Sequence, residues 1–307
     1  LIQRGVIAFG SHFNNHPCWG TNLSIMKQLH NFVLLGIIFF YFSFSYGQTP
    51  TVSWDKTLGG NGTDELYSII PTADGGFLLA GNSDSAASGD KTEDSKGSWD
   101  YWIVKTDVNG NKEWDKTIGG YDVDFLTSVI QTTDGGYLLG GYSISGAFYD
   151  KTENSKGHFD YWIVKTDANG NIEWDKTIGG VFYDYLSSVI QTTDGGYLLG
   201  GSSNSRASGD KTEDAKANMD YWIVKTDASG NIEWDRTIGG ATPFSGNTLK
   251  SVIQTTDGGY LLAGESGSDA SGDKTENSKG SIDYWIVKID TNGNIDWDKT
   301  LGGNSAD

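Results

Sequence analysis

Four acidic loop motifs are the strongest candidates for a chemical role in this sequence. The tetrapeptide Asp-Lys-Thr-Glu recurs at steps of 60, 60 and 63 residues. Its acids are Asp90, Glu93, Asp150, Glu153, Asp210, Glu213, Asp273 and Glu276. Carboxylate oxygens on loops suit a hard cation such as calcium, or the hydroxyls of a sugar. The motifs therefore predict a ligand-binding loop face.

A bland interpretation of the same motifs is that they are solvated polar loops. Lys151 and Lys156 offset the charges of Asp150 and Glu153 within one copy, whereas calcium needs several uncompensated oxygens. We therefore favour solvated polar loops over a metal site, and we expect no resident cofactor. The segment Asp167-Ala-Asn-Gly-Asn171 resembles half of a calcium loop, but its glycine is misplaced and no bidentate glutamate follows. We interpret it as a plain turn.

Catalytic chemistry has few candidate residues. Beyond residue 47 the chain has no cysteine, and His158 is its one histidine, which excludes thiol chemistry and cysteine-bound metals. An asymmetric active site needs residues that occur in one repeat only, and these are His158, Arg206, Arg236 and the insertion 241–247. We therefore favour a non-catalytic binding scaffold. The alternatives are a propeller hydrolase or lyase acting on glycans, or a quinoprotein-like dehydrogenase.

Internal repetition indicates what positions these loops. The tryptophans of the motif Trp-Asp-[Lys/Arg]-Thr fall at 54, 114, 174, 234 and 297. In the second repeat, apolar segments at 127–132, 137–142, 160–166 and 172–177 are separated by turn residues that include Asp134-Gly135 and Asn169-Gly170, which predicts four antiparallel strands. The middle two strands are apolar on both faces, so both sides of each sheet must be covered. We interpret Trp162 and Trp174 as core residues, and the charged last strand, with Asp175 and Lys176, as an outer edge.

Four-stranded units of constant length that cover one another predict an all-β fold, a β-propeller of four-stranded antiparallel blades. Four full repeats are visible, at about 65–117, 125–177, 185–237 and 248–300, within a repeat region of 48–307. Residues 51–57 match a fourth strand that lacks its own first three. Because residues 301–307 repeat the opening of another unit, we expect the propeller to be truncated at the C-terminus.

The N-terminal segment predicts export. Residues 26–47 combine Lys27, a short apolar run and small residues before Gln48, which is the pattern of a signal peptide rather than of a membrane span. We interpret residues 1–25 as upstream translation. The formal charge of −18 argues against a nucleic-acid partner, because binding to phosphates needs a basic face. We expect no nucleic-acid partner and no stable membrane span after cleavage.

The repeat resembles those of secreted proteins of gliding and related bacteria. The resemblance rests on the run from Asp160 to Trp174, on the Thr-Ile-Gly-Gly and Gln-Thr-Thr-Asp-Gly-Gly-Tyr segments that follow it, and on their copies across 51–307. It implies a secreted or cell-surface propeller with no assigned catalytic residue, usually followed by a type IX secretion sorting domain that is not found in this sequence. Together, residues and resemblance predict a binding or adhesion module whose partner is an extracellular glycan or protein surface.

Overall fold

A computed structural model describes residues 52–242 and 245–307 of the chain. The predicted upstream segment 1–25 and signal peptide 26–47 lie outside the described residues. The strands described below all belong to one compact unit, Trp54–Asp307. In the part that the structure describes, no helix is long and apolar enough to cross a membrane.

Sixteen strands form four antiparallel sheets across the described residues, and these residues contain no helix. Sheet 1 holds β1 (Asp64–Pro71), β2 (Phe77–Ser83), β3 (Asp100–Thr106) and β4 (Lys112–Ile118). Sheet 2 holds β5 (Asp124–Gln131), β6 (Tyr137–Ser143), β7 (Asp160–Thr166) and β8 (Ile172–Ile178). Sheet 3 holds β9 (Asp184–Gln191), β10 (Tyr197–Ser203), β11 (Asp220–Thr226) and β12 (Ile232–Ile238). Sheet 4 holds β13 (Asn247–Gln254), β14 (Tyr260–Ser266), β15 (Asp283–Ile289) and β16 (Ile295–Leu301).

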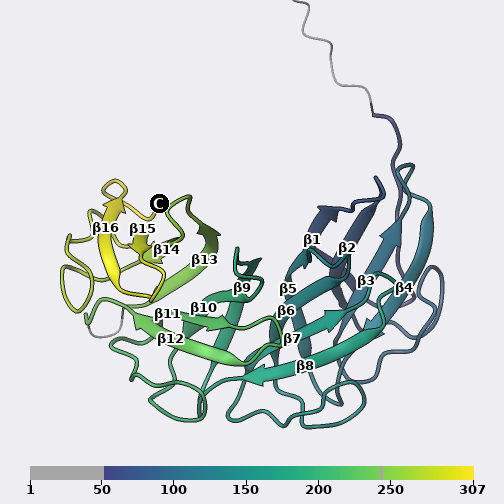
Figure 1. Ribbon diagram of the computed structural model, residues 1–307, viewed down its shortest axis with the longest axis horizontal. Helices are drawn as coiled ribbons and strands as arrows, with labels where there is room; N and C mark the ends of the chain where they lie inside the picture. Colours follow the sequence, from purple (N-terminus) through teal and green to yellow (C-terminus); the bar gives the residue numbers. More distant parts are fainter. Residues whose placement is uncertain (1–51, 243–244) are drawn as a thin grey trace, which may run out of the picture. The chain divides into compact units, whose positions relative to one another are not determined.

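Each sheet is one sequence repeat, and its strands pair in chain order. The first strand of each later sheet packs against the sheet before it, so that β5, β9 and β13 join successive sheets (Figure 1). This arrangement confirms the predicted all-β, propeller-like fold of four-stranded antiparallel units.

The predicted turns form through local chemistry. In the β5–β6 hairpin, Gly135 has a φ of +88°, a left-handed conformation that glycine adopts without a steric penalty. One Asp134 oxygen accepts hydrogen bonds from the Gly136 amide, at 2.9 Å, and from the Thr132 hydroxyl, at 2.6 Å. The same residues recur in the other three repeats, which explains why all four hairpins have one geometry.

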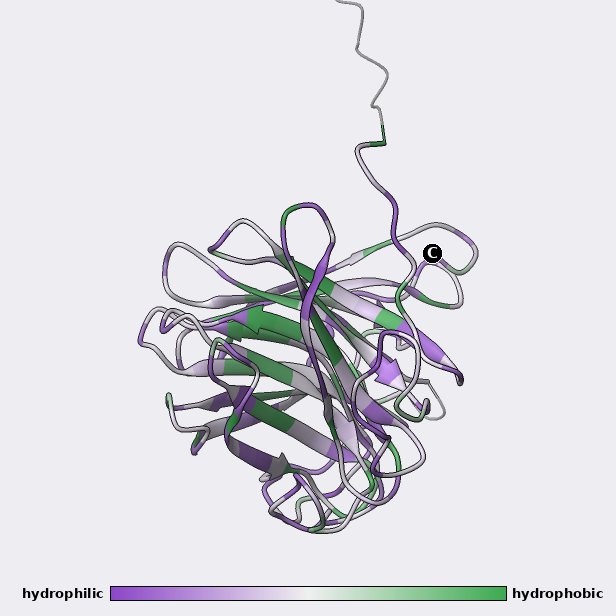
Figure 2. Ribbon diagram, turned by 90° about the vertical axis from the view of Figure 1, so that its right-hand side faces the viewer, coloured by the Kyte–Doolittle hydropathy of each residue, from purple (hydrophilic) through white to green (hydrophobic). Residues whose placement is uncertain are grey.

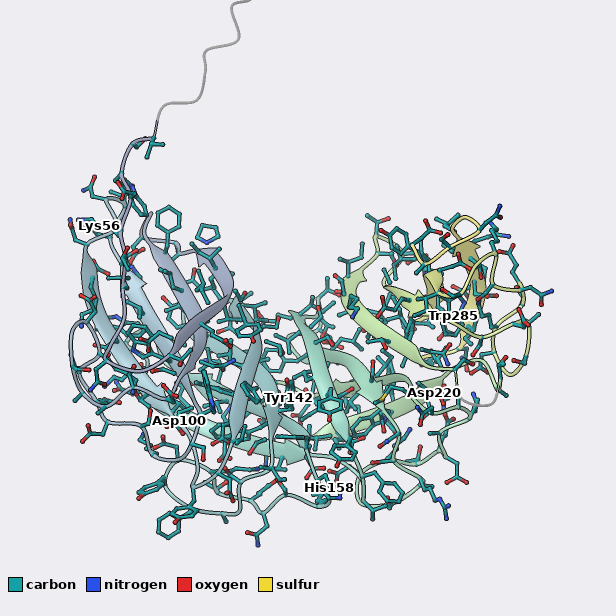
Figure 3. All side chains as sticks on the ribbon, turned by 180° about the vertical axis from the view of Figure 1, so that it is seen from behind. Lys56, Asp100, Tyr142, His158, Asp220 and Trp285 are labelled. Carbon is teal, nitrogen blue, oxygen red and sulfur yellow. The ribbon has the colours of Figure 1, made fainter. Side chains whose placement is uncertain are left out.

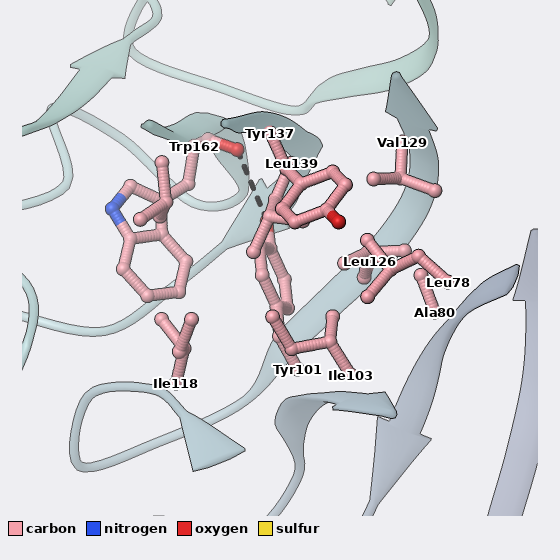
Figure 4. Close-up of a cluster of buried hydrophobic side chains, with 11 residues drawn as sticks. Leu78, Ala80, Tyr101, Ile103, Ile118, Leu126, Val129, Tyr137, Leu139 and Trp162 are labelled. Carbon is pink, nitrogen blue, oxygen red and sulfur yellow. Dashed lines mark hydrogen bonds between the residues drawn. The ribbon is translucent and has the colours of Figure 1, made fainter. Parts of the chain in front are cut away.

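The core lies between the sheets. At the junction of sheets 1 and 2, Tyr101 and Ile103 of one sheet pack against Leu126, Val129 and Trp162 of the next (Figure 4). Each junction repeats this packing, and hydrophobic residues gather on the strands while the loops are more hydrophilic (Figure 2). Trp162 is fully buried and Trp174 packs against the next cluster, which confirms their assignment to the core.

The outer strand corrects one prediction. Asp175 on β8 is not an exposed edge charge, since it is buried and accepts hydrogen bonds from the Trp162 indole, at 2.9 Å, and from Thr152. Its repeat counterparts do the same. The sequence pattern could not distinguish a solvated carboxylate from one that serves as a buried acceptor.

The first residues of the described region form no sheet. Residues 52–60, which include most of the predicted orphan strand 51–57, make no strand pairing. Trp54 nevertheless packs on Phe77 with ring centroids 6.2 Å apart, as Trp114 packs on Tyr137 at 6.4 Å. The segment thus lies where the outer strand of a preceding sheet would lie.

A buried hydroxyl at each junction provides a test of this packing. Tyr161 donates a hydrogen bond of 2.9 Å to the Trp222 carbonyl of the next sheet. We expect Tyr161→Phe to lower the free energy of unfolding by about 1 kcal/mol, the usual net value of one such bond. Tyr284→Phe is the matched control, because Tyr284 is exposed and should leave stability unchanged in dilute solution. Urea denaturation followed by tryptophan fluorescence measures both, and equal effects would contradict the assignment.

Candidate functional site

The aspartates of the four acidic loop motifs link successive repeats. Each accepts a hydrogen bond from the amide of a glycine in the preceding connection between sheets, with N–O distances of 3.0 to 3.2 Å. Three of them also form an ion pair with a lysine of the preceding repeat; the pairs are Lys96–Asp150, Lys156–Asp210 and Lys216–Asp273. The charges of these aspartates are therefore compensated between copies, whereas each motif glutamate lies 3.0 to 3.9 Å from a lysine or arginine of its own repeat. The basic partners differ from Lys151 and Lys156 of the same copy, which the sequence indicated.

The glutamates of the motifs act inside their own repeat. Glu93, Glu153, Glu213 and Glu276 each accept a hydrogen bond from the amide of a threonine on the outer strand, at 2.8 to 3.0 Å. The motif lysines are buried rather than solvated. Lys151, for example, lies 5.7 Å from the centre of the Trp162 ring and donates to Thr177, and its burial lowers its pKa to about 8.

These contacts define what the eight predicted carboxylates do in the fold. Every one of them fastens a long connection to a neighbouring strand or loop, with at least one oxygen engaged. Among the described residues, no group of three or more acids, histidines or cysteines is arranged to hold a metal ion. The Asp167 turn uses both carboxylate oxygens to accept hydrogen bonds from its own Asn169 and Asn171. A ligand role for the eight acids stays a prediction.

A second layer of carboxylates, which sequence reasoning missed, is buried at the junctions. Asp100 and Asp124 lie at the first junction, and Asp160 and Asp184 at the second, all without solvent exposure. One oxygen of Asp160 accepts the amides of Lys156 and Gly157, whereas its Oδ1 has no partner. Such an orphaned buried oxygen is costly unless it carries or accepts a proton.

The third junction shows how the orphaned oxygen is satisfied. There Asn247 replaces the second acid, and its Nδ2 donates a hydrogen bond of 2.8 Å to Oδ1 of Asp220, the counterpart of Asp160. At the first two junctions the matching group is a carboxyl, which can donate in the same way only when it is protonated. A proton on one carboxyl of each pair would take the place of the amide hydrogen of Asn247.

The electrostatics of the pairs agree with this geometry. Burial, with a smaller contribution from the charge of Asp184, raises the pKa of Asp160 to about 7 against the opposing effects of the Lys156 amide and of the Lys151 charge. Burial likewise raises the pKa of Asp124 to about 6, with a contribution from Asp100. Since aspartate ordinarily titrates near 4, the folded chain retains protons that the unfolded chain releases.

The acid pairs predict a specific pH dependence of stability. The raised pKa of Asp160 means that the folded state binds more protons between about pH 4 and about pH 7, so stability should fall as the pH rises through that window. Asp160→Asn supplies an amide at the orphaned oxygen, and should reduce this fall and stabilise the chain at pH 8. Asp220→Asn is the control, since Asp220 already accepts from Asn247 and gains nothing. Urea titrations at several pH values measure the effect; an unchanged profile for Asp160→Asn would contradict the shared proton.

Aromatic side chains form a continuous cluster that lies mostly in the second and third repeats and includes Trp99 of the first. His158 stacks on Tyr183 with ring centroids 4.6 Å apart and an interplanar angle of 6°. The chain of contacts continues through Phe159, Tyr185 and Tyr142, with Tyr142 and Tyr185 5.0 Å apart. Adding Phe125 and Trp99, this aromatic cluster comprises Trp99, Phe125, Tyr142, His158, Phe159, Tyr183 and Tyr185.

The aromatic cluster is partly open to solvent. Its tyrosine, phenylalanine and tryptophan rings are half-buried and His158 is exposed, at the side of the sheets where the long connections lie (Figure 3). Its residues come from the inner strands β5 and β9, from β6, and from the connections between strands. The cluster therefore joins the loop face to the inner edges of two neighbouring sheets.

Sequence reasoning missed this aromatic cluster because its members lie far apart in the chain. The available signal was the departure from the repeat. Tyr142 stands where the other repeats have Asn82, Ser202 and Glu265, and Tyr183 stands where the second repeat has Val123. Of the cluster residues, the sequence singled out only His158, as a catalytic candidate. In the structure His158 stacks on Tyr183, and among the contacts described no carboxylate pairs with it.

A second exposed aromatic group is built on a strained backbone. Tyr149 has a φ of +55°, whereas the matching positions of the other repeats are Gly89, Gly209 and Gly272, at +57° to +59°. Tyr149, Phe148 and Tyr121 are all exposed and contact one another edge to face. A bulky side chain in this conformation costs about 1 to 3 kcal/mol, so the tyrosine is retained at the expense of stability.

Restoring the repeat glycine tests this strain. We expect Tyr149→Gly to raise the free energy of unfolding by about 0.5 to 1 kcal/mol, because relief of strain exceeds the entropic cost of glycine and the lost ring contact. Tyr149→Ala is the control, since it removes the ring but keeps a side chain in the left-handed conformation. Thermal and urea denaturation compare the variants. A Gly variant no more stable than the Ala variant would show that the backbone is unstrained.

Comparisons with known proteins identify a fold but no family. No protein-family model and no curated protein matches the chain. A protein of unknown function from Dyadobacter fermentans is similar at 13% identity with a TM-score of 0.50, over 80% of this chain and 72% of that one. A protein of unknown function from Bacteroides caccae is similar at 12% identity with a TM-score of 0.40, over 82% and 87% of the two chains.

An apocarotenoid oxygenase of Synechocystis is also similar in structure. The identity is 14% and the TM-score 0.41, and the match covers 78% of this chain and 50% of the oxygenase chain. At such identities a shared fold carries no information about activity, because one architecture hosts many unrelated functions. The site must therefore be interpreted from its own residues.

Proposed function

We propose that the chain is a secreted or cell-surface binding scaffold without catalytic activity, and that it holds an extracellular glycan at the aromatic cluster. The observation that carries the proposal is the half-open row of rings in contact, most of them in the second and third repeats, which the other repeats do not reproduce. A binding site that occurs once in a repetitive scaffold allows the molecule to hold its ligand at one position only.

The chemistry of the rings suits a sugar. The C–H groups of a pyranose face carry positive charge and pack against the negative faces of aromatic rings. The phenol hydroxyls of Tyr142, Tyr183 and Tyr185 can both donate to and accept from sugar hydroxyls. Rigid aromatic side chains lose little conformational entropy when a ligand binds, so the half-buried cluster is already organised for contact.

The polar residues support a role in binding rather than in turnover. The acidic motif residues are engaged in fastening connections, and the buried acid pairs recur at two junctions, so neither supplies a singular acid and base. No specific contact in the described residues favours the glycan hydrolase, lyase or dehydrogenase alternatives. Export through the predicted signal peptide, attachment at the cell surface and a type IX route are parts of this proposal that rest on the sequence alone.

A glycan array followed by calorimetry tests the proposal. The wild-type chain should bind a set of glycans, and Tyr142→Ser combined with Tyr183→Val should weaken binding at least tenfold, because both rings are removed. These substitutions copy Ser202 and Val123 of neighbouring repeats, so the fold should tolerate them. Tyr121→Asn, which copies Asn61, is the control exposed tyrosine outside the aromatic cluster. Binding unaffected by the double substitution would overturn the site, and glycan turnover would overturn the non-catalytic assignment.

A further inference from the structure

Among the described residues, sheets 1 and 4 each have one apolar face on which no other sheet packs, and the segment at Trp54 borders the face of sheet 1. On sheet 1, Leu66 is 59% exposed, although its counterpart Leu126 is fully buried. On sheet 4, Tyr284 is 57% exposed, although its counterparts Tyr101, Tyr161 and Tyr221 are fully buried. The packed strand pairs join sheet 1 to 2, 2 to 3 and 3 to 4, and none of them joins sheet 4 to sheet 1.

The two uncovered faces are the two halves of an interface that the chain already makes three times. We define the head face as Leu66, Ile69, Phe77, Leu79, Trp102 and Val104 on sheet 1. We define the tail face as Ile253, Leu261, Tyr284, Ile286, Trp297 and Leu301 on sheet 4. The residues at the matching positions of sheets 1 and 2 pack together in the first junction. The internal junctions thus show what kind of surface covers each face.

One hydrogen bond fixes the register of this interface. The hydroxyls of Tyr101, Tyr161 and Tyr221 donate to the carbonyls of Trp162, Trp222 and Trp285 of the next sheet, at 2.9 to 3.0 Å. The next donor in this series would be the Tyr284 hydroxyl of sheet 4, and the acceptor that precedes the series would be the Trp102 carbonyl of sheet 1. Tyr284 is 57% exposed on the tail face, and Trp102 is 7% exposed on the head face, where it lines a groove with Trp54; both stand at the positions that the repeat dictates.

We propose that the tail face of one chain docks on the head face of a second copy of this chain, with the Tyr284 hydroxyl donating to the Trp102 carbonyl. The contact is heterologous, because it joins two different faces, so it leads either to a closed ring or to a longer assembly. The occupant follows from the packing inside the chain, where the same apolar residues and the same hydrogen bond meet three times.

The segment at Trp54 competes with this docking. It borders a groove of about 300 Å³ on the head face, lined by residues that include Leu66, Ile69 and Trp102. Trp54 packs on Phe77, the place that Trp297 of the docked copy requires, since Trp234 packs in that way on Tyr260. Trp54 makes one indole hydrogen bond, of 3.2 Å to the Val108 carbonyl, and its segment makes no strand pairing. Docking therefore displaces it.

Sedimentation velocity of the full chain over a range of concentrations tests the proposal. Because each copy carries a formal charge of −18, association should strengthen between about 0.15 M and about 1 M salt, where the screening length falls from about 8 to about 3 Å. Tail-blocked Tyr284→Lys and head-blocked Leu66→Lys should each weaken association at least tenfold. Both residues are exposed in the single chain, so folding should be preserved. Tyr121→Lys on an inter-sheet connection is the matched control.

Mixing the blocked variants distinguishes the orientation of the contact. The tail-blocked chain keeps a free head and the head-blocked chain keeps a free tail, so their mixture should form one-to-one dimers and nothing larger. Trp54→Ser should increase association severalfold by freeing the head face. The double variant Leu66→Lys/Tyr284→Lys gives the background association that uses neither face. Association of wild type equal to that background, or a mixture that forms no dimer, would overturn the proposal.

Discussion

The packing of one sheet on the next is the constraint on which the rest of this structure depends. A single four-stranded sheet of this sequence has apolar residues on both faces and cannot bury them by itself. Each junction solves this for two sheets at once, through an aromatic and aliphatic cluster and a buried tyrosine hydroxyl that binds the next tryptophan carbonyl. The chain is therefore a row of units that are stable only as neighbours.

Polar groups are arranged to serve the same junctions. The Asp-Lys-Thr-Glu motifs have the residue types of a ligand site. Their carboxylates instead accept hydrogen bonds from glycine and threonine amides, and three of the aspartates form ion pairs with lysines of adjacent repeats. Buried at the three junctions, two acid pairs and one acid–amide pair lie at the loop ends of the sheets. Strong repetition of a polar motif in this fold thus accompanies a structural role, because each junction needs the same fastening.

The residues that differ between repeats are the ones available for a specific function. Tyr142 of the aromatic cluster and the strained Tyr149 both replace small or polar residues of the other repeats, and in neither case does the replacement complete a junction. A side chain that scaffold stability does not require, and that remains open to solvent, is available for contact with a partner. This reasoning connects the proposed glycan site to the physical chemistry of the scaffold.

The all-β class, the four-stranded repeat, the hairpin turns and the burial of Trp162 could be predicted from the amino-acid pattern, because periodicity and turn chemistry are local properties that recur in each copy. The burial of Asp175 and Lys151, the effect of the Asp184 charge on the pKa of Asp160, and the cluster of rings from five separate segments became visible only in the folded chain. Those facts depend on which residues of different repeats come into contact. The sequence pattern of a single repeat does not show which of its residues contact a neighbouring repeat. Those contacts depend on how the sheets pack against one another.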